Sequence, residues 1–514
     1  MARDRFSRSG WMIVATVAAL ALATACNPQP SHDTKPGGRI VVARTADVDL
    51  LDPSRATAFQ TVQTLNLVYD TLIDTDDQGN LIPGLAEKWD TSDPTKLVLT
   101  LRDGVTFHNG AKLTAADAEA TLRRNLDPET GSVVASYLGN VTDVTATDDH
   151  TLVITLTQPD ASLLTALTYV GNAVLSKADI EAGTVGKEVN GTGPFLWKEW
   201  KQGQKLTLDA NPDYWDGAPK AEGVEFRVVP DEGTIVSGMK AGSFHLGLIS
   251  DPAVAKQITN DDTVILLTQP TTSYHVLQLN ATREPLNNLR VRQAIACAVN
   301  RDEIVDSVYF GVAQVTGPIT SPAYEYDPTK GLPCEPGNTE AAKAMLAEAG
   351  YPNGFTLDTI VMIGQYDTST NIAQVLQDQL KRIGVTLELN RQQTSVYVEN
   401  WKTANFDAAV ALNSGSTDPY LMYNRYFTSD GSLTVPAGYR SAKLDKLLRD
   451  GNATTDEAKR QQIFGELQRQ LLHDSPWVWL FRNQMHYAMS DQLTGFRSLP
   501  TESLEYLRKA SLTA

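Results

Sequence analysis

The sequence predicts an α/β protein, because short segments with alternating apolar residues recur along a chain that also carries long amphipathic helical segments. In the first half, alternation predicts strands at 39–43, 97–101, 205–209 and 224–229, and a hairpin at 144–156. In the second half, we expect helices at 288–299, 339–349, 370–383 and 455–473, separated by strands at 356–362, 386–389 and 407–412. Strands and helices mixed in this way favour packed α/β lobes over a helix bundle or a β-sandwich.

Turn-forming and capping residues mark the borders of the early elements. The first strand leads to a turn at Asp52-Pro53, and helical spacing follows over 61–72. Thr114 is a suitable N-cap, and Asp117 places a negative charge in the first helical turn. These two residues predict that a helix begins at this point.

The first 25 residues have the pattern of an export signal that ends at a cysteine. Three arginines precede an apolar run at 11–22, which is too short to span a bilayer comfortably. Small residues then lead to Cys26, whose thiol is expected to carry a lipid and to anchor the protein at the outer face of a membrane. An ordinary secretory cleavage site just before Cys26 is the alternative. The stretch NPQPSHDTKPGG after Cys26 contains three Pro and ends in two Gly, and residues 26–36 are expected to form a flexible tether.

Length and charge restrict the kind of protein. The 514 residues correspond to about three domain equivalents, and no segment after the export signal has the apolar length of a membrane span. The formal net charge is -17. This balance argues against nucleic acid as a partner, because phosphate binding needs clustered Lys and Arg.

Two cysteines remain after Cys26. In an exported chain, Cys297 and Cys334 are expected to form a disulfide bond. The alternative is two buried free thiols.

The sequence offers no complete set of catalytic or metal-binding residues. Ser237 and Lys240 match the S-x-x-K pattern of serine acyl-enzymes, but the companion S-D-N and K-T-G motifs are absent. The seven histidines are scattered, without an H-E-x-x-H motif, and residues 76–80 lack the downstream Glu of a calcium loop. We therefore expect no enzyme activity, no metal and no cofactor.

Five sequence blocks, taken in order and with their spacing, resemble the family 5 extracellular solute-binding proteins of bacterial ABC importers. The blocks are LIPGLAEKWD followed by LVLTLRDGVTFHNGAKLTAADA, then NGTGPFLWKEWKQGQKLTLDANPDYWDG, PLNNLRVRQAIACAVNRDEIVDSVYFG, AEAGYPNGF, and NFDAAV with Asp418-Pro419 after it. Together they extend the resemblance over nearly the whole mature chain.

This resemblance implies a two-lobed α/β fold of the periplasmic-binding-protein class II type, with mixed sheets and a hinge between the lobes. Lobe I would comprise 37–271 plus 480–514, with 61–185 as an extra subdomain, and lobe II would comprise 272–479. The family's function implies a monomer that holds a small polar solute between the lobes. The solute would be a peptide, a sugar or another polar metabolite, and it would be delivered to the permease subunits of an ABC transporter.

By position, the resemblance places the solute pocket between three segments and the extra subdomain. The expected contact residues are Thr57, Phe59, Tyr137, Tyr397, Asn413, Ser414, Gly415 and Ser416. Rings that cover apolar faces and amide or hydroxyl groups that fix orientation suit a small polar ligand.

One position in this segment departs from the peptide binders of the family. They carry an aspartate where this chain has Gly415, and that aspartate holds the α-ammonium of the peptide. We therefore expect weak binding of free dipeptides through their amine, with open space beside Gly415 for neutral polar groups. The alternative is that Asp418 takes over the ammonium.

Two other classes of function stay open at this point. One is a sensor or chaperone-like surface lipoprotein without a transport role. The other is a secreted hydrolase, against which the missing nucleophile–base pair argues.

Overall fold

The computed structural model describes residues 38–77, 79–321, 324, 327, 329–363 and 367–513. The expected signal peptide (1–25), Cys26 and the tether (26–36) lie outside the described residues. Within the described part of the chain, no helix combines the length and the apolar character needed to cross a membrane.

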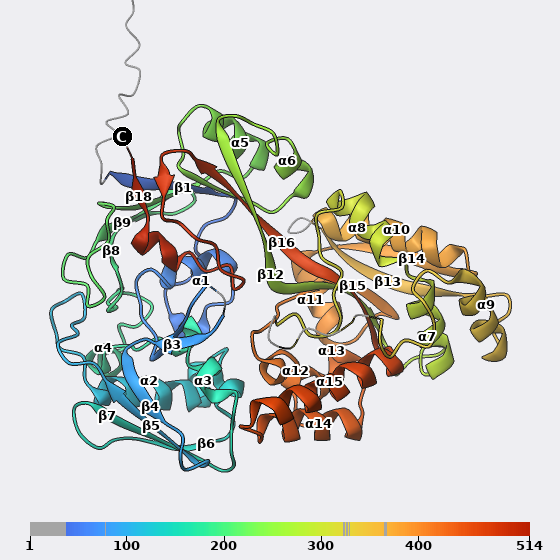
Figure 1. Cartoon of the computed structure of the whole chain (residues 1–514), viewed down its shortest axis with the longest axis horizontal. Coiled ribbons are helices and arrows are strands. Elements are labelled where there is room, and N and C mark those ends of the chain that lie inside the picture. Colours follow the sequence, from blue (N-terminus) through green and yellow to red (C-terminus); the bar gives the residue numbers. More distant parts are fainter. Residues whose placement is uncertain are drawn as a thin grey trace, which may run out of the picture. The chain divides into compact units, whose positions relative to one another are not determined.

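The largest sheet contains ten strands of the described chain, in the order β14-β13-β15-β12-β16-β11-β1-β10-β9-β8 (Figure 1). Its strands are β1 (Arg39–Arg44), β8 (Phe195–Lys201), β9 (Lys205–Ala210), β10 (Gly223–Val228), β11 (Leu246–Ile249), β12 (Val264–Leu279), β13 (Phe355–Ile363), β14 (Val385–Gln393), β15 (Ala408–Asn413) and β16 (Trp477–Ser490). β1 pairs in parallel with β10 and β11, and β13 in parallel with β14 and β15, whereas the other pairs are antiparallel. The sheet is therefore mixed, as the sequence predicts.

Two long strands, β12 and β16, connect the two ends of this sheet. Figure 1 shows them side by side, running from the elements around β1 to those around β15. Their pairing is interrupted between Pro270 and Tyr274. Residues before the interruption, such as Val264, pack into one group of apolar clusters, and Val276 and Leu277 after it pack into another. The interruption falls where the chain is predicted to change lobe, although the lobe boundaries themselves stay a prediction.

A separate antiparallel sheet, β4-β5-β7-β6, lies within the predicted extra subdomain. Its strands are β4 (Ala86–Asp90), β5 (Lys96–Leu101), β6 (Val141–Ala146) and β7 (Thr151–Leu156). The predicted hairpin is thus formed by β6 and β7. Helix α2 (Ala115–Leu126) packs on this sheet and begins after Thr114, whose backbone N–H donates to Asp117 Oδ2 at 2.9 Å. The helix start predicted from these two residues is confirmed.

The remaining described elements are short pairings and helices. The short strand pairs are β2 (Ile73–Thr75) with β3 (Leu81–Pro83), and β17 (Leu493–Thr494) with β18 (Ser511–Leu512). The α-helices are α1 (Phe59–Leu65), α3 (Leu163–Ala166), α4 (Lys177–Ala182), α5 (Glu232–Lys240), α6 (Pro252–Lys256), α7 (Leu289–Ala298), α8 (Arg301–Tyr309), α9 (Thr339–Glu348), α10 (Asp367–Lys381), α11 (Thr394–Lys402), α12 (Pro419–Phe427), α13 (Thr434–Ala437), α14 (Ala442–Asn452) and α15 (Glu457–Asp474). The 3₁₀ turns are η1 (Pro53–Arg55), η2 (Pro128–Thr130), η3 (Ala135–Leu138), η4 (Val170–Asn172) and η6 (Glu505–Lys509).

One early helix is shorter than its sequence pattern predicts. Helical spacing was expected through residue 72, but α1 ends at Leu65. Beyond it, the Val68 carbonyl accepts a hydrogen bond from the Gly193 N–H at 2.9 Å. The backbone at Val68 is thus engaged by a distant segment, and this tertiary pairing overrides the local helical pattern. A Cβ atom at Gly193 would overlap the Val68 carbonyl, so the close approach requires glycine.

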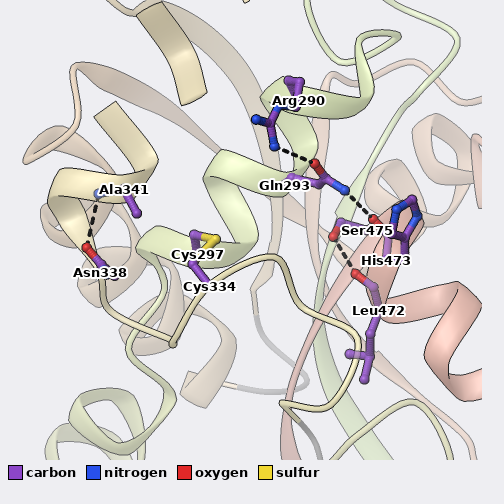
Figure 2. The surroundings of a disulfide bond; sticks show 9 residues. All are labelled: Arg290, Gln293, Cys297, Cys334, Asn338, Ala341, Leu472, His473 and Ser475. Carbon is purple, nitrogen blue, oxygen red and sulfur yellow. Dashed lines mark hydrogen bonds between the residues drawn. A yellow bond between two sulfur atoms is a disulfide. The ribbon is translucent and has the colours of Figure 1, made fainter. Parts of the chain in front are cut away.

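The disulfide bond expected between Cys297 and Cys334 is present (Figure 2). Cys297 is fully buried near the end of α7, and Cys334 lies in the segment that leads to α9, with the two Cα atoms 5.8 Å apart. Asn338 ends this segment and caps α9 by accepting a hydrogen bond from the Ala341 N–H at 3.0 Å. The disulfide therefore links the segment that precedes α9 to helix α7.

Candidate functional site

The β12–β16 interruption separates two parts of the fold. A cavity of about 340 Å³ is lined by segments from both of these parts. Its walls include the loop before α1, the region of η3 and η4, the middle of β12 and the loop between β15 and α12. The predicted contact residues that line it are Thr57, Phe59, Tyr137, Ser414, Gly415 and Ser416. The structure thus brings these side chains together, and their contact with a solute stays a prediction.

Two predicted contact residues are not among those that line this cavity. Tyr397, on α11, is buried, and its hydroxyl donates to the Val410 carbonyl at 3.1 Å. Asn413 is the last residue of β15, is also buried, and pairs with Tyr274 of β12. Neither is among the residues that line the cavity. Asn413 Nδ2 is buried and makes no hydrogen bond within the described chain, and contact of either residue with a solute stays a prediction.

A hydrogen bond joins opposite walls of the cavity. The Tyr169 hydroxyl donates to Ser416 Oγ at 2.9 Å, and the ring of Tyr169 lies 5.2 Å from that of Tyr137, measured between centroids. Ser416 Oγ also accepts from the Asp418 N–H at 3.0 Å. This chain of bonds fixes the loop before α12 against two aromatic rings from the first half of the chain.

Gly415 lies against backbone, so the expectation of open space beside it is wrong. A Cβ atom at this position would overlap the Thr272 carbonyl oxygen and would lie 2.8 Å from Thr320 Oγ1. Thr320 Oγ1 itself donates to that carbonyl at 2.5 Å. Glycine is present here because strand β12 passes too close for any side chain, and an aspartate does not fit in this arrangement.

Asp418 is fully engaged within the protein. It is 2% exposed, and its Oδ2 accepts from Arg460 Nη2 at 2.6 Å. Its Oδ1 caps α12 by accepting from the N–H groups of Tyr420 and Leu421 at 2.9 and 3.3 Å. A carboxylate with both oxygens committed in this way is a structural group, which disfavours the alternative that Asp418 holds the ammonium of a solute.

Asp70 lies in another part of the cavity wall. Its carboxylate accepts hydrogen bonds from Thr192 Oγ1 at 2.8 Å, from the Tyr214 hydroxyl at 3.0 Å and from Trp215 Nε1 at 2.9 Å. Burial nevertheless raises the pKa of Asp70 above its usual value. The three donors fix this carboxylate in place.

Two more carboxylates and one guanidinium complete the same wall. Burial, together with the neighbouring charge of Asp74, raises the pKa of Glu505 to about 8. Arg508 lies between Asp74 and Asp216, with its Nη2 3.5 and 3.9 Å from their carboxylate oxygens. This wall therefore holds more acidic than basic groups.

The sequence did not indicate Tyr169, Arg425 or the acidic residues of the cavity wall, which are Asp70, Asp74 and Glu505. Tyr169 and the acidic groups come from segments without a recognisable local motif. Arg425 had a usable signal, because Pro419 begins a helix in which Leu421 and Arg425 are separated by one turn and share a face. Both residues line the cavity.

Replacing Gly415 by alanine should lower the free energy of unfolding by about 1–3 kcal/mol, because the added methyl group would force β12 or the loop before α12 to move. Urea unfolding measures the change. Gly465→Ala, within α15, is the matched control: its Cβ would meet only Arg469 Nη1 at 3.8 Å, so its stability should be unchanged or slightly higher. Equal stability of Gly415→Ala and the wild type would contradict the close approach.

The fold and this cavity between two groups of apolar clusters define a solute-binding protein with two lobes. Residues 80–433 match the family described as bacterial extracellular solute-binding proteins, family 5 Middle. The chain therefore belongs to this family, and the two-lobed α/β fold predicted from the sequence is confirmed. The family consists of solute-binding proteins rather than enzymes.

Similar proteins cover nearly the whole chain. It is 29% identical over 502 residues to the oligopeptide-binding protein AppA of Bacillus subtilis (92% of this chain, 91% of AppA). It is 26% identical to the glutathione-binding protein GsiB of Pectobacterium atrosepticum (98% of both chains). The structure of Bacillus subtilis AppA in complex with a nonapeptide superposes with a TM-score of 0.77 at 27% identity, over 94% of this chain and 100% of AppA. The substrate-binding protein CtaP of Listeria monocytogenes superposes with a TM-score of 0.82 at 25% identity, over 93% and 100%.

Proposed function

We propose that this chain is the extracytoplasmic receptor of an ABC importer and captures a small peptide or a similar polar solute. The observation that carries the proposal is the cavity of about 340 Å³, whose walls come from both sides of the β12–β16 interruption. Aromatic rings, hydroxyl groups and a small number of charges line it, as suits a polar organic solute. AppA and GsiB are named for oligopeptide and glutathione binding, which supports a peptide-type solute here.

Binding would close the two lobes by bending at the strand interruption. We place lobe I at 37–271 plus 480–514, with 61–185 as its extra subdomain, and lobe II at 272–479. A solute that contacts both walls has higher affinity for the closed form and therefore shifts the population towards it. The permease would then distinguish the loaded receptor from the empty one by shape.

Delivery to a permease is tested in the native host. A strain that lacks this chain should lose uptake of the peptides that the purified protein binds, and the wild-type gene should restore it. Unchanged uptake in the deletion strain would contradict the importer role and would favour a sensor or chaperone-like role.

We further propose that Cys26 carries a lipid that holds the receptor at the membrane. The basic, apolar and small-residue order before Cys26 supports this. Cys26→Ser should release the protein into the soluble fraction or leave the precursor uncleaved, whereas Ser31→Ala in the tether should remain with membranes. Cell fractionation with mass measurement of the mature N-terminus checks this result. A processed Cys26→Ser protein that still fractionates with membranes would contradict the anchor.

A further inference from the structure

Arg425 is a cation on the cavity wall that has no acidic partner among the described residues. It lines the cavity from α12, and none of the described ion pairs includes it. By contrast, Arg449, Arg460 and Arg508 each lie within 4.0 Å of a carboxylate. Arg425 Nε is buried and makes no hydrogen bond within the described chain. A guanidinium stays protonated, so this unpaired group contributes a full positive charge.

The immediate surroundings of Arg425 are tyrosines. Its guanidinium carbon lies 5.3 Å from the ring centroid of Tyr426, and Tyr137 and Tyr169 line the same cavity. Ring faces attract a cation only modestly and offer no charged acceptor to its N–H groups. The protein therefore leaves an anion-binding position that a ligand can complete.

The charges of the cavity are arranged unevenly. Asp70, Asp74 and Glu505 lie on one wall, with Arg508 as the basic group among them. An anionic group of a solute is attracted by Arg425, which has no carboxylate beside it among the described residues. The position of Arg425 therefore orients a solute that carries a carboxylate.

We propose that Arg425 binds a carboxylate of the solute, which makes the solute a peptide-type molecule with a free carboxylate held against α12. The inference rests on the proposed function and specifies its ligand class. A guanidinium can hold a carboxylate through two parallel hydrogen bonds, which lysine cannot reproduce. Recognition of the solute through its carboxylate is also consistent with Gly415, because no aspartate is present at that position to bind the amine of a peptide.

Two pools of synthetic tri- and tetrapeptides without Asp or Glu test this proposal. One pool has free C-terminal carboxylates and the other has C-terminal amides, so the pools differ only in that charge. Calorimetry should show that the wild type binds the free-acid pool about tenfold to a hundredfold more tightly. Arg425→Gln should lose this preference by weakening only free-acid binding, and Arg425→Lys should recover part of it.

The control variant is Arg440→Gln. Arg440 is not among the residues that line the cavity, and its Nη2 donates to Thr434 Oγ1 at 3.3 Å, so the preference should be that of the wild type. Equal wild-type affinity for both pools would overturn the carboxylate site and leave the proposed function standing. A full preference retained in Arg425→Gln would overturn the assignment to Arg425. Failure of the wild type to bind either pool would overturn both the inference and the peptide-type solute.

Discussion

Replacing Arg460 by methionine is expected to lower the free energy of unfolding by about 3–5 kcal/mol. Arg460 is 6% exposed, and its Nη2 lies 2.6 Å from Asp418 Oδ2. Its other nitrogens donate to the Tyr324 hydroxyl at 2.7 Å and to the Gly451 carbonyl at 3.1 Å. Methionine would fill similar volume but would leave the buried Asp418 carboxylate without its counter-charge. Denaturant unfolding, followed by circular dichroism, measures the loss.

Two further variants test whether the unpaired charge of Asp418 is the cause of the lost stability. Asp418→Asn with Arg460→Met should be more stable than Arg460→Met alone, because asparagine still caps α12 and carries no charge. Arg449→Met removes a more exposed guanidinium and should cost about 1 kcal/mol or less. A double variant as unstable as the single one would show that the ion pair is not the cause. Because α12 carries Leu421 and Arg425 to the cavity, Arg460→Met should also weaken binding of the free-acid peptide pool.

Reducing the Cys297–Cys334 disulfide is expected to lower the free energy of unfolding by about 3–4 kcal/mol. The two cysteines are 37 residues apart, and the crosslink restricts this loop in the unfolded chain. The measurement is the unfolding free energy of the wild type with and without reductant.

The matched control is the double variant Cys297→Ala with Cys334→Ala, whose stability should not respond to reductant. Peptide mapping under non-reducing conditions gives an independent check. Thiols that can be alkylated at both positions in native, air-exposed protein would contradict the crosslink.

Two features were predicted correctly from the sequence. One depends on residues that are neighbours in the chain, and the other on the limited choice of partners for the cysteines. The start of α2 follows from Thr114 and Asp117, which satisfy each other within one helical turn. The disulfide follows because two cysteines in an exported chain have one pairing available to them. The length of α1 was overestimated because Val68 pairs with Gly193, which is distant in the sequence.

The cavity was predicted only in part, because its walls depend on such distant contacts. Ser414, Gly415 and Ser416 were placed there by their position in the family pattern. The Thr272 carbonyl that fills the space beside Gly415 belongs to another strand, and no local pattern indicates it. Similarly, Tyr169 reaches Ser416 only because the chain folds back between the two segments.

Equilibrium dialysis of the purified wild-type protein against the free-acid peptide pool, followed by mass spectrometry of both compartments, tests the central claim most directly. Reversible capture without chemical change predicts enrichment of peptide on the protein side, up to one molecule per chain, and recovery of every bound peptide with its original mass after the protein is unfolded. Equal peptide concentrations in the two compartments, or bound peptides recovered as altered products, would contradict the account.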